Sequence, residues 1–394
     1  MHSVQTVKVP GREVVLGIDF GTSTSSAAAF FENEVHVVLD GGDPIVPSVV
    51  YLPRAGDPIV GIEALRHGAA DPFGLLTGLK RLLGRRADDP AIKHLDAGVA
   101  YRIVAAQNGG ALVRARGADY APTQLVAAVL ARLKRLAEVR FGGDIRHAVL
   151  TVPVEKAPEY TGALKRAASI AGMEILAFVP EPVAGVVAHG YDRPGDRRIA
   201  VCDFGGGTFD ATLMVQQGNR FQGVASAGDP FLGGEDFDVT LADAVDAVIF
   251  KAARVSLRRD VTIWSQLLLR IESAKRQLST SAQTRLRMRD AYTTGERRHD
   301  IDLLVDREWI EPRWKPLVDR ATQVIGGLLD TARWGNRDID DVVLIGGTTL
   351  VPLVQRELSA LFRRKLVPSP TANLSVVRGA ALLAARHAPV QLAH

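Results

Sequence analysis

Apolar runs separated by glycine turns occupy two stretches of the chain, and each stretch predicts three antiparallel strands. In the first stretch, one strand spans 14–19 and the next two end at Phe31 and at Leu39. In the second stretch, the strands span 199–204, 211–215 and 220–225. The first strand of each stretch ends in Asp-Phe-Gly, and the two aspartates, Asp19 and Asp203, lie 203 − 19 = 184 residues apart. This repeat predicts that the chain is a duplication of one α/β lobe.

Between the two stretches, apolar residues recur at the helical period. One such helix begins behind Thr123, a candidate N-cap, and ends at Gly142. It is followed by a strand at 147–152, a helix at about 159–171, a strand at 174–179 and a helix that opens at Pro182. Strands that alternate with helices predict crossover connections and a mixed sheet.

The length of 394 residues exceeds the size at which one hydrophobic core usually stops growing, so two lobes are expected. We place lobe I at 1–197 and lobe II at 198–394. Each lobe is expected to carry a small inserted subdomain, at about 40–119 and about 239–316.

Charge and composition exclude several classes of partner. The net charge of +4 arises from 48 basic and 44 acidic residues that are intermixed, so we expect no nucleic-acid-binding surface. Residues 1–11 contain no sustained apolar stretch, and no segment approaches the roughly 20 apolar residues of a membrane span. The single cysteine, Cys202, lies in an apolar run that predicts a buried thiol. We therefore expect a cytoplasmic protein.

The two Asp-Phe-Gly turns contain the residue types that a phosphate site needs. Glycines in a tight turn expose backbone N–H groups, and the carboxylates of Asp19 and Asp203 could hold Mg²⁺ through retained waters. Hydroxyl groups follow both turns, at Thr22 and Ser23 and at Thr208. A single turn of this kind is more often a hairpin whose aspartate bonds to its own backbone. Two matched turns half a chain apart favour the phosphate site.

Two more glycine turns precede predicted helices, at 232–235 and at 346–348. The second follows an apolar strand and precedes a helix with Pro352 in its first turn, a geometry that presents backbone to a nucleotide. On another predicted helix, one face carries residues spaced at i, i+3, i+4 and i+7, namely Glu272, Lys275, Arg276 and Ser279. Without further context, that face is more often an exposed set of ion pairs.

Together these motifs resemble the nucleotide-binding domain of the DnaK-type, seventy-kilodalton heat-shock chaperones, which belong to the superfamily of actin and the sugar kinases. Five segments carry the resemblance: two phosphate loops at 17–22 and 203–210, an adenosine loop at 346–349, a segment that connects the lobes at 181–184, and a family signature at 228–238. The match runs from about 14 to 386, in the family order. The segment 80–85 and the helix face from Glu272 to Ser279 are similar to the chaperone branch rather than to actins or sugar kinases.

The resemblance implies an α/β fold, a two-lobed actin-like ATPase in which each lobe is a duplicated ribonuclease-H-like mixed sheet with helices. It implies that ATP or ADP binds between the lobes, and that Asp19 and Asp203 orient hydrated Mg²⁺. Lys80 would orient the attacking water, with Glu181 and Asp210 completing a polar cage. The phosphates would be held by Gly21, Thr22, Ser23, Gly205, Gly206, Gly207 and Thr208. The adenosine would be held by Gly233, Gly234, Glu272, Lys275, Arg276, Ser279, Gly346, Gly347 and Thr348.

Four positions depart from the family pattern. Leu350 stands where the family usually has an arginine beside the adenine, so we expect weaker nucleotide binding. Thr161 and Ser169 occupy the places of arginines that couple the domain to its partner domain and to J-domain cochaperones, and Asn373 replaces an aspartate. The family's linker and peptide-binding domain do not follow His394, so no peptide client site is expected within this chain.

Three functions are compatible with this sequence. The leading one is slow, Mg-dependent ATP hydrolysis that switches lobe closure, with a cochaperone or a nucleotide exchange factor as possible partner. The second is a nucleotide-sensing scaffold with little hydrolysis, favoured by Leu350 and Thr161. The third, a small-molecule kinase of the same superfamily, is disfavoured by Lys80 and the adenosine helix.

Overall fold

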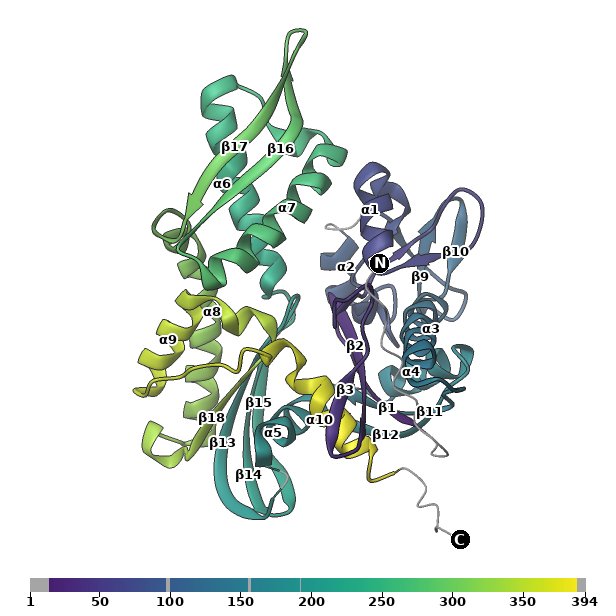
Figure 1. The fold of residues 1–394 in the computed structure, drawn as a ribbon, viewed down its shortest axis with the longest axis vertical. Coiled ribbons are helices and arrows are strands. Elements are labelled where there is room, and N and C mark those ends of the chain that lie inside the picture. Colours follow the sequence, from purple (N-terminus) through teal and green to yellow (C-terminus); the bar gives the residue numbers. More distant parts are fainter. Residues whose placement is uncertain (1–13, 97–99, 155–156, 192, 388–394) are drawn as a thin grey trace. The chain divides into compact units, whose positions relative to one another are not determined.

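The computed structural model describes residues 14–96, 100–154, 157–191 and 193–387. The polar N-terminal segment at 1–11 and the tail at 388–394 lie outside the described residues. The chain forms two compact units (Figure 1). Within the described residues, the first unit comprises 14–67, 73–195 and 374–387, and the second comprises 68–72 and 196–373.

The first unit is built on a six-stranded mixed sheet in the order β12-β11-β1-β2-β3, with β4 paired to β2. Its strands are β1 (Val15–Phe20), β2 (Thr24–Phe31), β3 (Glu34–Val37), β4 (Val46–Pro47), β11 (His147–Val152) and β12 (Glu174–Pro180). β1 pairs with β2 in antiparallel and with β11 in parallel orientation. Strand β1 is almost wholly buried, so the aspartate near its end is held by a rigid element.

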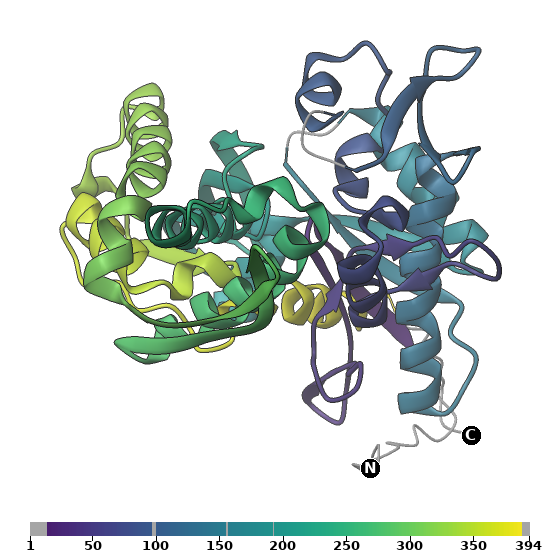
Figure 2. The same ribbon diagram turned by 90° about the horizontal axis from the view of Figure 1, so that it is seen from above.

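Helices and two small sheets complete the first unit. Its helices are α1 (Ile62–Ala70, which ends beyond this unit), α2 (Pro90–Asp96), α3 (Pro122–Phe141), α4 (Pro158–Ile170), α5 (Glu181–Val186) and α10 (Ser375–Ala384). The small sheets consist of β5 (Val50–Tyr51), β6 (Ile59–Val60) and β7 (Leu75–Leu76), and of β8 (Arg102–Ala105), β9 (Ala111–Ala115) and β10 (Ala118–Tyr120). Helices α3 and α4 pack against each other (Figure 2).

The predicted N-cap of α3 was wrong. The N-cap is Ala121 rather than Thr123, because Pro122 fixes the first helical residue and the Gln124 side chain accepts the Ala121 N–H at 3.1 Å. The predicted end at Gly142 is confirmed, since this residue adopts the left-handed conformation at φ 75°.

The second unit repeats the arrangement of the first. Its sheet has the order β15-β14-β13-β18, formed by β13 (Gly195–Phe204), β14 (Phe209–Gly218), β15 (Arg220–Asp229) and β18 (Asp341–Ile345). Strand β13 lies between β14 and the parallel β18, just as β1 lies between β2 and the parallel β11. In both units, therefore, the strand that ends in Asp-Phe-Gly occupies the same place, and the predicted mixed α/β architecture is confirmed.

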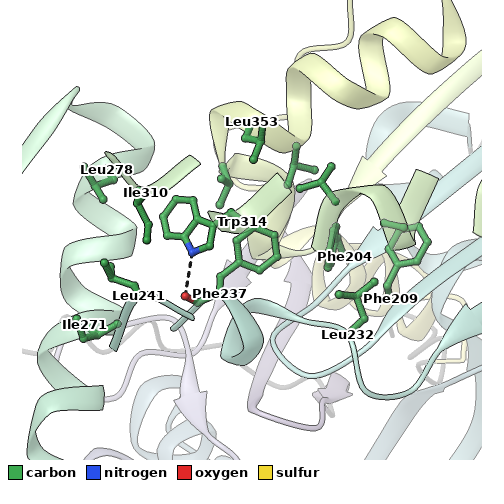
Figure 3. Close-up of a cluster of buried hydrophobic side chains, with 14 of the residues drawn as sticks. Phe204, Phe209, Leu232, Phe237, Leu241, Ile271, Leu278, Ile310, Trp314 and Leu353 are labelled. Carbon is green, nitrogen blue, oxygen red and sulfur yellow. Dashed lines mark hydrogen bonds between the residues drawn. The ribbon is translucent and has the colours of Figure 1, made fainter. Parts of the chain in front are cut away.

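The helices of the second unit are α6 (Gly234–Ala253), α7 (Val261–Thr280), α8 (Arg307–Ala332) and α9 (Pro352–Phe362). A long hairpin of β16 (Gln283–Thr294) and β17 (Arg297–Asp306) extends from this unit (Figure 1). The core surrounds Trp314 of α8, whose indole N–H donates to the Phe237 carbonyl at 3.0 Å (Figure 3). Phe204 packs edge-on against Phe209 and Phe237, which anchors the second Asp-Phe-Gly turn to this core.

The C-terminal helix α10 belongs to the first unit, whereas we expected residues 198–394 to form lobe II. Helix α10 packs against β1, β2 and α5 of the first unit. Gly379 permits this close approach, because a Cβ atom there would overlap the backbone of Ala184. The boundaries of the two inserted subdomains stay predictions.

Candidate functional site

In the first unit, Asp19 lies near the end of β1 beside Thr151 of β11. Because these strands are parallel, their carboxyl ends meet at one edge of the sheet. The Thr151 hydroxyl donates to Asp19 Oδ1 at 3.0 Å, so this carboxylate is bonded to another strand rather than to its own turn. Burial and the nearby Glu181 raise the pKa of Asp19 to about 6, against the opposing effects of Lys80 and Thr151.

Lys80 and Glu181 form an ion pair beside Asp19. Lys80 Nζ donates to Glu181 Oε1 at 2.7 Å, and the side chains are only 11% and 12% exposed. Lys80 lies in a short 3-10 helix, η2 (Leu79–Leu82), whose two leucines are buried. Burial by itself would lower the pKa of Lys80, but the carboxylate of Glu181 outweighs it and the pKa is raised. Lys80 is thus a charged group held at a buried position rather than a solvated helix lysine.

The glycine turn after β1 contains an unused hydroxyl. Gly21 N–H donates to the Thr24 carbonyl at 3.0 Å, and the Thr22 side chain is buried. Ser23 Oγ is buried and has no hydrogen-bond partner among the described residues. Because buried hydroxyl groups are normally paired, this atom marks a position where a polar ligand atom fits.

Replacing Ser23 with alanine should therefore leave the free energy of unfolding unchanged or slightly raised, while weakening ATP binding roughly tenfold. Ser25 supplies the control, since its hydroxyl pairs with that of Ser48 at 2.7 Å. Ser25→Ala should cost roughly 1–3 kcal/mol of stability without a comparable loss of affinity. Urea denaturation and calorimetric titration would measure both quantities. Equal ATP affinity of Ser23→Ala and the unmodified protein would contradict the assignment.

In the second unit, three glycine motifs converge on one turn. Gly205 N–H donates to the Thr208 carbonyl at 3.0 Å, which closes the turn after β13. The Gly205 carbonyl accepts from Gly234 N–H at 3.0 Å and from the Thr348 hydroxyl at 2.7 Å. A Cβ atom at Gly233 would overlap the backbone of Gly206, so only glycine fits there. The turn is therefore held between the start of α6 and the segment after β18.

Two carboxylates border this turn. Gly346 has φ 86°, and a Cβ atom there would lie 2.8 Å from Asp203 Oδ1. A Cβ atom at Gly228 would lie 2.5 Å from Asp210 Oδ1. Both glycines therefore let the backbone approach a carboxylate more closely than a residue with a side chain could.

The predicted face of α7 is confirmed as helical, but its central residue has an unpredicted partner. Lys275 Nζ donates to Asp238 Oδ2 and to the Gly234 carbonyl, both at 2.6 Å. The Lys275 and Asp238 side chains are 12% and 11% exposed. Burial raises the pKa of Asp238 to about 7, and Lys275 opposes this shift. Glu272 and Ser279 are half-buried, whereas Arg276 is exposed.

The predicted site residues form two groups. The first unit brings together Asp19, Lys80 and Glu181, and its turn holds Gly21, Thr22 and Ser23. The second unit joins a larger set by the contacts above, namely Asp203, Gly205, Gly206, Gly233, Gly234, Lys275, Gly346 and Thr348. Also in the second unit are Gly207, Thr208, Asp210, Glu272, Arg276, Ser279 and Gly347.

Sequence reasoning missed Thr151, Tyr160 and Asp238, which contact or face the predicted residues. Of these three, only Asp238 could have been found from the sequence, because it belongs to the motif at 228–238.

The described residues contain no group of three or more His, Cys, Asp or Glu side chains that could hold a metal ion. Within the same ranges, no helix combines the length and the apolar character needed to cross a bilayer.

Similarity to known proteins covers nearly the whole chain. The sequence model of the Hsp70 protein family matches residues 15–393. The mitochondrial heat shock 70 kDa protein of Solanum tuberosum is 33% identical over 375 residues, which is 95% of this chain and 55% of that protein. The chain therefore spans about half the length of this curated relative. The mixed α/β units agree with the two-lobed actin-like ATPase fold of that family.

Proposed function

Because this chain belongs to the Hsp70 family, we propose that it binds ATP with Mg²⁺, hydrolyses it slowly and couples the nucleotide state to closure of its lobes. The observation that carries this proposal is the buried Lys80–Glu181 pair beside Asp19. Burying an ion pair costs desolvation energy, so a buried pair is seldom explained by stability alone. A buried pair beside a third charged group is instead typical of a site that acts on a charged ligand.

In the proposed reaction, a water oxygen attacks the terminal phosphorus of ATP. The new P–O bond forms as the bond to the ADP oxygen breaks, ADP departs with that electron pair, and both protons of the water end on the inorganic phosphate. Lys80 would stabilise the charge on the terminal phosphate and orient the water, with Glu181 holding the ammonium in place. Phosphoryl transfer of this kind needs positioning and electrostatic stabilisation more than covalent chemistry.

The carboxylates of Asp19 and Asp203 would hold Mg²⁺ through water. Carboxylates suit this ion, because it prefers oxygen ligands and keeps several of its waters. Bound Mg²⁺ neutralises negative charge on the phosphate oxygens. The hydroxyl of Ser23, which is unpaired among the described residues, could donate to a phosphate oxygen.

The adenosine would lie against α7 and the segment after β18, contacting Glu272, Lys275, Arg276, Ser279, Gly346 and Gly347. Leu350 supplies no cation to stack on the base, which removes a contribution of roughly 0.5–2 kcal/mol. Weak nucleotide affinity is the consequence.

The proposal is tested by incubating the purified protein with ATP and Mg²⁺ and following ADP release, with calorimetric titrations of ATP in the presence and absence of EDTA. We expect slow release of ADP and phosphate, and a large loss of affinity when Mg²⁺ is chelated. A chain that binds neither ATP nor ADP would contradict the proposal. Phosphate transfer to a metabolite instead of to water would indicate the kinase alternative.

A nucleotide-sensing scaffold is the second candidate. Leu350 removes a cationic contact from the adenosine, which favours binding without efficient turnover. ATP binding with no ADP formed over hours would support this function. Chaperone activity, interaction with a cochaperone or exchange factor and a cytoplasmic location stay predictions.

A further inference from the structure

Tyr160 carries a buried hydroxyl that makes no hydrogen bond within the described part of the chain. The residue lies in the first turn of α4, and its hydroxyl oxygen is buried without a hydrogen-bond partner among the described residues. An unpaired buried donor is unfavourable, so native proteins rarely retain one without a reason. A hydroxyl of this kind fits an acceptor that arrives with a ligand.

The start of α4 is fixed against the segment that carries Lys80. Gly84, which follows η2, has φ 69° and approaches the α4 backbone so closely that a Cβ atom would lie 2.7 Å from Tyr160 N. The 3-10 helix with Lys80 and the helix with Tyr160 are therefore held together by backbone packing. This contact fixes the backbone of Tyr160 relative to the segment that carries Lys80.

The surroundings of the hydroxyl are charged. It interacts electrostatically with Lys80, Glu181 and Asp19, and burial together with the two carboxylates raises the pKa of Tyr160 to about 12, although Lys80 opposes this. The phenol is therefore a neutral donor at physiological pH. With both carboxylates ionised, Lys80, Glu181 and Asp19 together carry a net charge of −1. An anionic ligand beside them is therefore best bound by hydrogen-bond donors that are neutral or positive, and a tyrosine hydroxyl is neutral.

We propose that Tyr160 donates a hydrogen bond to the terminal phosphate of bound ATP, and that this contact distinguishes ATP from ADP. The inference rests on the proposed function. The terminal phosphate is the acceptor because Tyr160 shares its buried cluster with Lys80, the residue proposed to act on that group. The Tyr160 hydroxyl, which belongs to the first unit, would thus bind the phosphate that reacts.

The test is a calorimetric comparison of the unmodified protein, Tyr160→Phe and Tyr120→Phe, titrated with Mg²⁺ and either ADP or the β,γ-imido analogue of ATP. Tyr160→Phe should bind the analogue roughly tenfold more weakly and ADP with unchanged affinity. Tyr120 is half-buried in β10 of the same unit, and its phenylalanine variant should change neither affinity. Without nucleotide, the melting temperature of Tyr160→Phe should be unchanged or raised, since no hydrogen bond is lost.

Each other outcome overturns the inference. Unchanged affinity for the analogue would show that the hydroxyl does not touch the terminal phosphate. An equal loss for the analogue and for ADP, or a lower melting temperature, would show a structural role. An unmodified protein that binds neither ligand would remove the proposed function as well, whereas normal binding with an unaffected Tyr160→Phe would remove this inference alone.

Discussion

Replacing Lys80 with methionine is expected to lower the rate of ATP hydrolysis by roughly 100-fold or more, while ATP affinity changes far less. Methionine keeps much of the length of the side chain but removes the ammonium group that Glu181 holds at 2.7 Å. Without that charge, the buried position beside Glu181 holds no ammonium group to stabilise the negative charge that builds up on the terminal phosphate in the transition state. Binding depends mainly on the glycine turns and the adenosine face, so it should largely persist.

Single-turnover measurements of ADP formation and calorimetry would separate the two effects. Because the variant also leaves Glu181 without its buried partner, it should lose roughly 3–5 kcal/mol of stability, which urea denaturation would measure. Lys80→Arg keeps a cation beside Glu181 and should preserve the fold, yet it should still hydrolyse ATP poorly because the guanidinium group has a different shape. Lys165, exposed on α4, provides the control. Normal turnover by Lys80→Met would refute the role proposed for Lys80.

The parts of the site that depend on local backbone could be predicted from the sequence. A glycine turn after an apolar strand has few alternative conformations, so the turns at 19–21 and 203–205 were foreseeable. The strand at 147–152 was also predicted with its observed bounds, because apolar residues occupy four of its six positions. Repetition of the Asp-Phe-Gly turn then indicated the duplication that the two sheets display.

The remainder depends on tertiary contacts that no local pattern records. The spacing of residues in the sequence does not predict that Lys275 pairs with Asp238. Hydrophobic periodicity likewise does not predict that the hydroxyl of Tyr160 is buried. The packing of α10 on the first unit depends on a close backbone approach between Gly379 and Ala184, which come from distant parts of the sequence. Motif similarity located the loops, whereas the partners of their charged residues required the structure.

The buried pair on α7 leads to the second large effect. Replacing Lys275 with methionine should destabilise the second unit by roughly 3–5 kcal/mol at pH 8, because Asp238 is left as an uncompensated buried charge. Asp238 Oδ1 is already without a partner among the described residues, so no other donor stands ready to replace the ammonium group. All four tryptophans lie in the second unit, so their fluorescence during urea denaturation reports on this unit.

The loss of stability caused by Lys275→Met should depend on pH. The pKa of Asp238 in the folded protein, about 7, lies above its ordinary value of 3.8. Between these values the folded protein holds a proton that the unfolded chain has released, so the free energy of unfolding falls as the pH rises from about 4 to about 7. Lys275 lowers this pKa, and its removal therefore extends the fall to higher pH. The difference between Lys275→Met and the unmodified protein should be small at pH 5 and should grow steadily above pH 7.

A double variant separates the lost ion pair from lost packing. Lys275→Met combined with Asp238→Leu removes both charges, and it should recover most of the stability and abolish the additional pH dependence, because a buried ion pair is often replaceable by apolar groups. If the double variant were as unstable as Lys275→Met at pH 8, the cost would come from packing or from the lost hydrogen bond to the Gly234 carbonyl. If Lys275→Met lost the same stability at pH 5 and pH 8, Asp238 would not be the group responsible.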